Sequence, residues 1–317
     1  MTQPTLSIVV PTREGIPEYW IEALLKINGD VELILVHPPG MKKLPIRDPR
    51  VQQINSLFRG EIIQRMTGLM NASKKYVLTV NCDELLHPDI AEITKQYFTK
   101  FPDSWVLRLS RKSLKYGDEA SLKSPWEGVY NIDEMKTCGV SREDRNLCGK
   151  PNYLGEIPIA PLHNKLDPLC IFRGRKDQHG RHTENFDKKV WNNQILQATL
   201  TDIRDAMILF GPFKYFPFWC LDRLLGLSIQ AKYYEKGKII GHILPEPEQI
   251  RIEENPPEYR KTKRFYVFAE LLLLKNHPQY GYLWNLILAQ FASIPVRGIS
   301  YIYRQLSGNK VQKNTNG

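Results

Sequence analysis

Acidic and amide side chains cluster at Asn81-Cys82-Asp83-Glu84, directly after the predicted buried strand Tyr76–Val80. Carboxylates at the edge of an apolar core lose hydration, so a cation or hydrogen bonds must compensate. In open α/β sheets, ligands bind beyond the carboxyl ends of the strands. One hypothesis is that Asp83, helped by a neighbour, holds a divalent cation on a phosphate-bearing substrate. The other is a polar turn, with Pro88-Asp89 beginning the next helix.

The elements around this cluster alternate between strands and helices. Short apolar runs rich in β-branched residues predict buried strands, and helical spacing of apolar residues predicts the segments between them. This is the pattern of a parallel sheet, and right-handed crossovers bring the loops after its strands to one edge. Strands are predicted at 6–10, 31–36, 51–54, 76–80 and 105–109, helices at 18–27, 60–72 and 88–98, and a shared crevice at 11–14, 37–40 and 81–84.

Later segments give weaker patterns. Further strands are expected at 157–162 and 169–172, and helices at 188–200 and 223–234. His179 and His182 lie three residues apart in a polar loop without a third ligand, which does not favour a metal pair.

Composition indicates a soluble globular protein. The chain has 317 residues, of which 42% are hydrophobic and 25% charged. Its five cysteines form no CxxC pair, which argues against a zinc site and a disulfide scaffold and favours the reducing cytoplasm. The N-terminus shows no signal-peptide pattern, and no apolar run is long enough to cross a bilayer.

The C-terminal part carries a surplus of positive charge. From Pro257 onward there are nine Lys or Arg residues and two acidic ones, around helical segments rich in Leu, Phe and Tyr. We expect one domain at 1–243 and a basic, aromatic-rich helical extension at 244–317. The extension either caps the core or contacts an anionic membrane surface, which would place the protein at the inner face of the membrane. No nucleic-acid-binding motif accompanies the charge.

Two stretches resemble family 2 glycosyltransferases. Ser7–Glu14 (SIVVPTRE) is similar to the opening strand of that family, and Arg59–Asp89 resembles its stretch from an Arg-containing helix to the metal-binding strand end. Arg65 and Gly68 fall where the family has Arg-Asn-x-Gly, and Asp83 falls at the last acid of its Asp-x-Asp. The resemblance covers about the first 110 residues well and 205–240 loosely, through Gly211–Phe213 and Glu235–Ile239.

The resemblance implies an α/β fold of the GT-A (Rossmann-like) type. It also implies inverting transfer of a sugar from a nucleotide-diphosphate sugar to a saccharide or lipid-linked acceptor, in polysaccharide or glycolipid synthesis. One Mg²⁺ or Mn²⁺ ion would neutralise the diphosphate leaving group. The implied metal ligands are Asp83, Asn81 and Glu84, and the implied nucleotide-sugar-binding residues are Pro11, Thr12, Arg13, Glu14, Arg65, Asn81, Cys82 and Asp83.

The chain also departs from the family pattern. Asn81 replaces the first acid of Asp-x-Asp, and His37 replaces the acid that usually ends the second strand. The catalytic Glu-Asp pair of the family would fall at Leu225-Gly226, where no acid is present. These departures keep a second hypothesis open, that of a non-catalytic GT-A-like scaffold that binds membrane or polysaccharide-assembly machinery.

An inverting transfer needs a carboxylate within hydrogen-bond reach of the acceptor hydroxyl. Asp222 is the candidate, because it follows a proline- and aromatic-rich segment that could desolvate it. An ion pair with Arg223 or a helix-start position would also explain this residue. Glu184 and Asp187 are weaker alternatives.

Overall fold

The computed structural model describes residues 5–128, 131–139, 150–209, 218–254 and 267–292, with only the backbone described at 205–209, 218–220 and 267–269. Several expectations therefore lie outside the described residues. They include the acceptor-side segment 211–213 and most of the basic residues of the extension.

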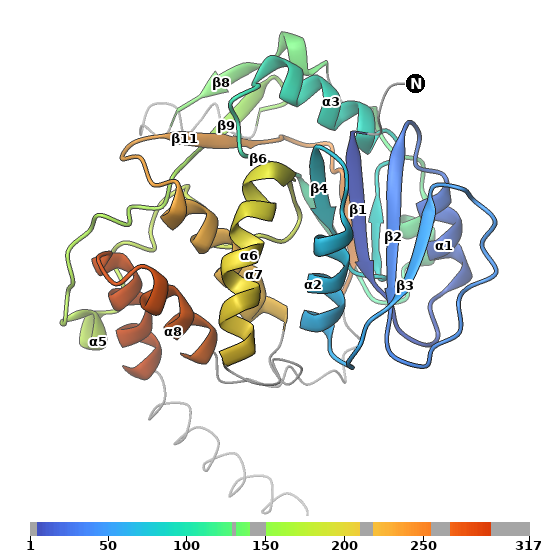
Figure 1. Cartoon of the computed structure of the whole chain (residues 1–317). Coiled ribbons are helices and arrows are strands. Elements are labelled where there is room, and N and C mark those ends of the chain that lie inside the picture. Colours follow the sequence, from blue (N-terminus) through green and yellow to red (C-terminus); the bar gives the residue numbers. More distant parts are fainter. Residues whose placement is uncertain (1–4, 129–130, 140–149, 210–217, 255–266, 293–317) are drawn as a thin grey trace, which may run out of the picture. The chain divides into compact units, whose positions relative to one another are not determined.

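A nine-stranded sheet forms the centre of the fold, in the order β3-β2-β1-β4-β10-β6-β11-β9-β8 (Figure 1). Five of its eight strand pairs are parallel, so the mainly parallel sheet expected from the sequence is confirmed. Its strands are β1 (Leu6–Pro11), β2 (Val31–His37), β3 (Val51–Asn55), β4 (Tyr76–Thr79), β6 (Val106–Arg108), β8 (Lys136–Cys138), β9 (Tyr153–Pro158), β10 (Lys189–Asn192) and β11 (Ile239–Ile243).

Strand β10 corrects the expected helix at 188–200. Residues 189–192 form a strand that runs antiparallel between β4 and β6, and the helix begins only at Asn193. Because β10 is antiparallel, its first residues lie beside the last residues of β4. Val190 pairs with Leu78 in this register. The segment before β10 therefore reaches the same edge of the sheet as the loops after β1 and β4.

In the larger unit, helices cover both faces of the sheet and pack on the side chains that alternate along the strands. Ile8 belongs to a core with Trp20 of α1 and Tyr97 of α3, whereas Val9 faces α2. Helices α6 and α7 pack on each other and on α2. The helices are α1 (Glu18–Leu25), α2 (Glu61–Asn71), α3 (Ile90–Lys100), α4 (Glu119–Lys123), the 3₁₀ turn η1 (Ile132–Glu134), α5 (Cys170–Arg173), α6 (Asn193–Leu209), α7 (Phe218–Lys232) and α8 (Val267–Asn276).

Helix α2 lies unusually close to β1. A Cβ atom at Gly68 would lie 2.3 Å from Val9 Cγ1 and 3.0 Å from Val36 Cγ2, closer than such contacts allow. Glycine at this position therefore lets the helix pack directly on the strands.

Helix α5 corrects another expectation. A strand was expected at 169–172, but residues 170–173 form one helical turn.

A second, three-stranded sheet in the order β5-β12-β7 was not predicted. It joins β5 (Glu84–Leu86), β12 (Ile250–Glu253) and β7 (Arg111–Leu114). Arg251 of β12 is buried, pairs with Glu248 at 2.9 Å and stacks on Trp126 at 4.0 Å. Its guanidinium also donates to the carbonyl oxygens of Ser124 and Pro125.

The chain divides into two compact units, one formed by 1–160 and 181–264 and the other by 161–180 and 265–317. The predicted boundary at 243/244 differs from this division and stays a prediction. Among the described residues, no helix combines the length and apolar character needed to cross a bilayer. The cysteine pattern argued against a disulfide scaffold, but Cys138 is disulfide-bonded; Cys82 and Cys170 are free thiols.

Candidate functional site

The first part of the candidate site is the loop after β1. Thr12 is buried. Its hydroxyl group donates to the Val36 carbonyl oxygen at 3.0 Å and also contacts His37 Nδ1 at 2.6 Å. His37 in turn contacts Gln53 Oε1 through Nε2 at 2.9 Å. Gln64 of α2 donates to the carbonyl oxygens of Thr12 and Val36, at 2.8 and 2.7 Å. The loop backbone is therefore fixed from both β2 and α2.

Arg65 lies at the centre of the polar network. Its side chain is fully buried, and its Nη2 donates to Asn81 Oδ1 and, at 3.3 Å, to Glu61. Its Nη1 lies 3.6 Å from Asp187 Oδ1. A buried guanidinium requires such partners, because an uncompensated charge in the core is costly. Arg65 thereby connects the end of β4 to the segment before β10.

Glu84 fills the space behind Asn81. Its carboxylate accepts from the Asn81 backbone N–H and side-chain amide, both at 3.0 Å, and lies 3.0 Å from Lys188 Nζ. Burial and the neighbouring Asp187 carboxylate raise the pKa of Glu84, against the opposing effect of Lys188. Both Asn81 and Glu84 thus have partners within the protein.

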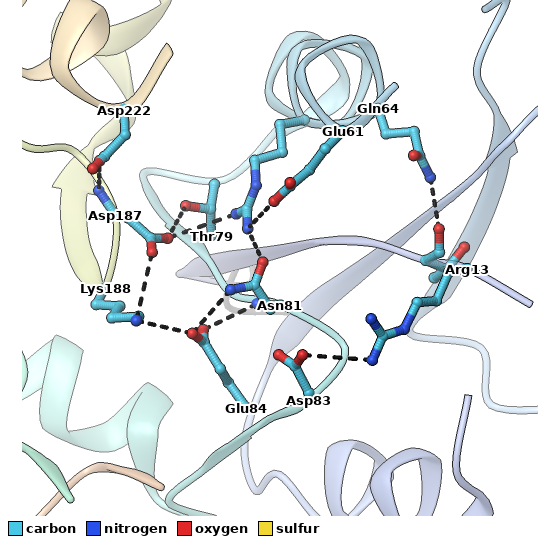
Figure 2. A network of polar contacts seen from close by, with 12 residues as sticks. Arg13, Glu61, Gln64, Thr79, Asn81, Asp83, Glu84, Asp187, Lys188 and Asp222 are labelled. Atoms are coloured by element: carbon cyan, nitrogen blue, oxygen red, sulfur yellow. Dashed lines mark hydrogen bonds and ion pairs between the residues drawn. The ribbon is translucent and has the colours of Figure 1, made fainter. Parts of the chain in front are cut away.

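Lys188 reaches this cluster from a strained backbone. Among the described residues, it is the non-glycine residue with positive φ, at 58°. This left-handed conformation is unfavourable for a side chain as long as lysine and concentrates at functional sites. Its ammonium lies between two carboxylates, 3.0 Å from Glu84 and 4.0 Å from Asp187 (Figure 2). This backbone conformation therefore positions the Lys188 ammonium group between the carboxylates of Glu84 and Asp187.

Asp222 of α7 approaches the same segment from the other side. It is buried, and its Oδ1 accepts a hydrogen bond from the Asp187 backbone N–H. Burial and the Asp187 carboxylate raise the pKa of Asp222 to about 6. Burial likewise lowers the pKa of the neighbouring Lys189 to about 8, against the attraction of Asp222. A carboxyl group that ionises near neutral pH suits general-base chemistry.

The outer part of the site is open to solvent. Arg13 and Asp83 come from the loops after β1 and β4, point toward one another, and pair at 3.5 Å with side chains 65% and 45% exposed (Figure 2). Glu14 is also exposed, whereas Pro11 is buried at the end of β1. The Cys82 thiol is buried as well, and its burial raises its pKa. The exposed side chains able to meet a ligand here are therefore charged.

The donor set permits one mode of divalent-cation binding. Mg²⁺ in enzymes often takes one or two carboxylates together with substrate phosphates and water. Asp83 presents a carboxylate of this kind, whereas Asn81 Oδ1 is bonded to Arg65 and Glu84 is bonded to Asn81 and Lys188. Within the part of the chain that the structure describes, no three His, Cys, Asp or Glu residues converge on a metal position.

Sequence reasoning missed several members of this network, namely Glu61, Gln64, Thr79, Lys188 and Lys189. Thr79 lies 3.3 Å from Asp187, which had been weighed only as an alternative base. Recognising 189–192 as an antiparallel strand would have placed Asp187 and Lys188 at the site. Glu184, the other alternative base, pairs with Arg223 at 3.2 Å.

Comparison with known proteins gives similarity in structure only. No family model matches the chain, and no curated protein matches its sequence. Residues 1–349 of S. aureus TarS, crystallised with UDP-GlcNAc, superpose with a TM-score of 0.51 at 16% identity, covering 90% of this chain and 71% of that one. The same protein crystallised with UDP gives 0.51 and 16%, over 90% and 70%. The mannosyltransferase PcManGT from Pyrobaculum calidifontis, with GDP-Man and Mn²⁺, gives 0.43 and 14%, over 92% and 70%.

The similarity to TarS establishes the fold class. The mostly parallel sheet flanked by helices matches GT-A-type, Rossmann-like glycosyltransferases, and a helical region is present toward the C-terminus. The expected GT-A-like fold is confirmed.

Proposed function

We propose that this chain is a glycosyltransferase that takes a sugar from a nucleotide-diphosphate sugar. The observation that carries the proposal is the meeting of Arg13 and Asp83, from the ends of two neighbouring parallel strands, on the open edge of a GT-A-like sheet. In sheets of this kind the crevice beyond these strand ends is the ligand site. The UDP-GlcNAc in the TarS structure is a donor of the proposed class.

Cationic side chains are suited to the donor diphosphate. Arg13 is exposed beside Asp83, and Lys188 is nearly a quarter exposed among the carboxylates. Arg65 lies behind them and holds Asn81 in place. Charged hydrogen bonds from guanidinium and ammonium groups to phosphate are among the stronger ones available to a protein. We assign donor binding to these residues together with Thr12 and Asp83.

A divalent cation held by Asp83 and the donor phosphates would offset the negative charge that builds on the departing diphosphate. The metal therefore remains part of the proposal, with Asp83 as its protein ligand. Asn81 and Glu84 act on it indirectly, because their hydrogen bonds fix the turn that presents Asp83.

We assign the general base to Asp222, with Asp187 as the alternative. The base takes the proton of an acceptor hydroxyl, whose oxygen attacks the anomeric carbon as the bond to the diphosphate breaks, so the configuration inverts. Asp222, with a pKa of about 6, is ionised at neutral pH. Asp187 has a more exposed side chain, 14%, and lies between Arg65 and Lys188. The acceptor is a saccharide or a lipid-linked saccharide, in polysaccharide or glycolipid synthesis in the cytoplasm.

One observation favours a second candidate function, that of a non-catalytic scaffold. Asn81 replaces an acid, and its amide, Glu84 and Lys188 satisfy one another within the protein. Polar groups that satisfy one another in this way would need no ligand.

Thermal unfolding with a panel of nucleotide sugars tests the proposal. One nucleotide family should raise the melting temperature in the presence of Mn²⁺, because a ligand that binds the folded state stabilises it by mass action. Asp83→Ala should abolish that shift. Asp133→Ala, which removes an exposed carboxylate of η1 outside the network, should retain it. Absence of any shift with every nucleotide sugar would favour the scaffold.

A further inference from the structure

An exposed apolar patch lies on the segment 161–180. The patch consists of four side chains within seven residues, which are 49%, 46%, 40% and 84% exposed: Leu166, Leu169, Ile171 and Phe172. Single exposed apolar residues are common on protein surfaces, but a concentration of large ones indicates an interaction site.

The backbone that carries the patch is held firmly by buried polar contacts. Asn285, from the helical stretch 281–292, accepts from the Asp167 N–H at 2.7 Å and donates to the Lys165 carbonyl at 3.1 Å and to Asp177 at 3.0 Å. Cys170 is buried between the exposed residues, and its thiol contacts the Asn285 carbonyl at 3.5 Å. The same helical stretch presses on the segment, since a Cβ at Gly281 would lie 2.4 Å from the Asn164 carbonyl oxygen. The segment is built to hold its apolar side chains outward.

Basic side chains outnumber acidic ones around the patch. The exposed charged side chains of 161–180 are basic: Lys165, Arg173 and Lys176. Of the two acids in the segment, Asp177 pairs with the buried Arg175 at 2.9 Å, and Asp167 is partly exposed and accepts from the Leu169 N–H at 3.0 Å. Lys165 and Lys176 also line a cavity of about 230 Å³ beside the patch. Apolar side chains bordered by cations match the boundary between the acyl chains and anionic headgroups of a lipid bilayer.

We propose that residues 165–176 form a membrane-docking surface for anionic lipid bilayers, with Leu166, Leu169, Ile171 and Phe172 entering the headgroup boundary and Lys165, Arg173 and Lys176 contacting the headgroups. This site is distinct from the basic extension near the C-terminus and does not depend on the proposed transferase activity. It gives the chain a means of meeting a substrate at a membrane surface without crossing it.

Co-sedimentation of the intact protein with phosphatidylcholine vesicles, with and without phosphatidylglycerol, tests the surface. The protein should bind the anionic vesicles and bind neutral ones roughly tenfold more weakly. Leu169→Ser/Phe172→Ser and Arg173→Glu/Lys176→Glu should each weaken binding to anionic vesicles by roughly tenfold or more. Leu57→Ser/Phe58→Ser is the matched control, because it removes two apolar side chains that are 84% and 59% exposed elsewhere. It should bind as the unaltered protein does.

Three results would overturn the proposal. The first is no binding to anionic vesicles by the unaltered protein. The second is unchanged binding by both patch variants while Arg260→Glu/Lys261→Glu/Lys263→Glu loses it, which would assign the contact to the extension. The third is a dimer of the unaltered protein that Leu169→Ser/Phe172→Ser converts to a monomer, which would identify a second copy of the chain as the occupant. Unchanged melting temperatures of the variants confirm that they fold.

Discussion

In two buried clusters of the larger unit, the pKa values of the carboxyl groups shift in opposite directions. At Arg251, burial alone would raise the pKa of Glu248, but hydrogen bonds, above all the one from Arg251, hold that pKa below its ordinary value. At Arg65, several carboxylates crowd together, and the pKa values of Glu84 and Asp222 rise. The first cluster is a matched ion pair that also stacks on Trp126 and binds backbone carbonyls. The second keeps acids close to one another, an arrangement that occurs both at functional sites and in structural ion-pair networks.

Replacing the central arginine of each cluster should give the largest effects. Arg65→Met and Arg251→Met each leave a buried or partly buried acid without its cationic partner. Each should therefore lower the free energy of unfolding by about 3–5 kcal/mol, as measured by urea denaturation. Only Arg65→Met should also abolish stabilisation by a nucleotide sugar. Equal loss of that stabilisation in both variants would show that the two clusters do not differ in function. Arg65→Lys, which keeps the charge, provides a milder comparison if the methionine variants do not fold.

The pH dependence of stability should have opposite signs in the two clusters. The raised pKa of Asp222 means that the folded protein loses stability as pH rises from about 4 to about 6, by roughly 2–3 kcal/mol. Asp222→Asn can still accept the Asp187 N–H, so its stability relative to the unaltered protein should increase across that window and stay level above it. The lowered pKa of Glu248 means the reverse. Glu248→Gln should be less stable at neutral pH, and the deficit should disappear as pH falls through the lowered pKa.

Denaturation curves of the two variants and the unaltered protein, measured from about pH 2 to about pH 8, test this difference. Parallel curves for Asp222→Asn and the unaltered protein would contradict a raised pKa at Asp222.

The smallest predicted effect concerns the backbone at Lys188. With φ at 58°, Lys188→Gly should be more stable than Lys188→Ala by about 1 kcal/mol, because both variants lose the ammonium but only glycine accepts this conformation freely. Lys112 offers the matched position in the other cluster. It lies in β7, 4.0 Å from Glu248, and a strand interior favours alanine over glycine by about 0.5–1 kcal/mol. The same order of stability at both positions would remove the evidence for strain at Lys188.

Much of the parallel half of the sheet could be predicted from the sequence. Strands β1, β2 and β4 are short apolar runs closed by polar loops, and each lies within two residues of its expected range. Strand β10 could not be separated from the helix after it, because Lys189–Asn192 runs into α6 without a glycine or proline. Pairing with β4 and β6 decides its structure, and such pairing is not visible locally. At 169–172 the apolar residues suggested a strand, but residues 170–173 form a helical turn.

The candidate site was likewise predictable at the ends of the parallel strands and not at the segment before β10. The resemblance and the strand ends placed Thr12, Arg13, Arg65, Asn81 and Asp83 in one region, and the structure brings them together. Lys188 could not be found, since its position depends on the antiparallel strand that follows it and on a backbone conformation rare for lysine. The partners of Asn81 and Glu84 were hidden for the same reason. The roles of all these residues in binding and catalysis remain predictions.

The tight seat of α2 at Gly68 has a consequence for the charged edge of the sheet. Gln64 lies one helical turn before Gly68, and its amide is tied to the carbonyl oxygens of Thr12 and Val36. A methyl group at 68 would lift the helix from β1 and carry both Gln64 and the adjoining Arg65 outward with it. The position of Arg65 relative to the other charged groups proposed to bind a diphosphate therefore depends on an apolar contact. That contact, between Gly68 and the side chains of Val9 and Val36, requires that residue 68 has no Cβ atom.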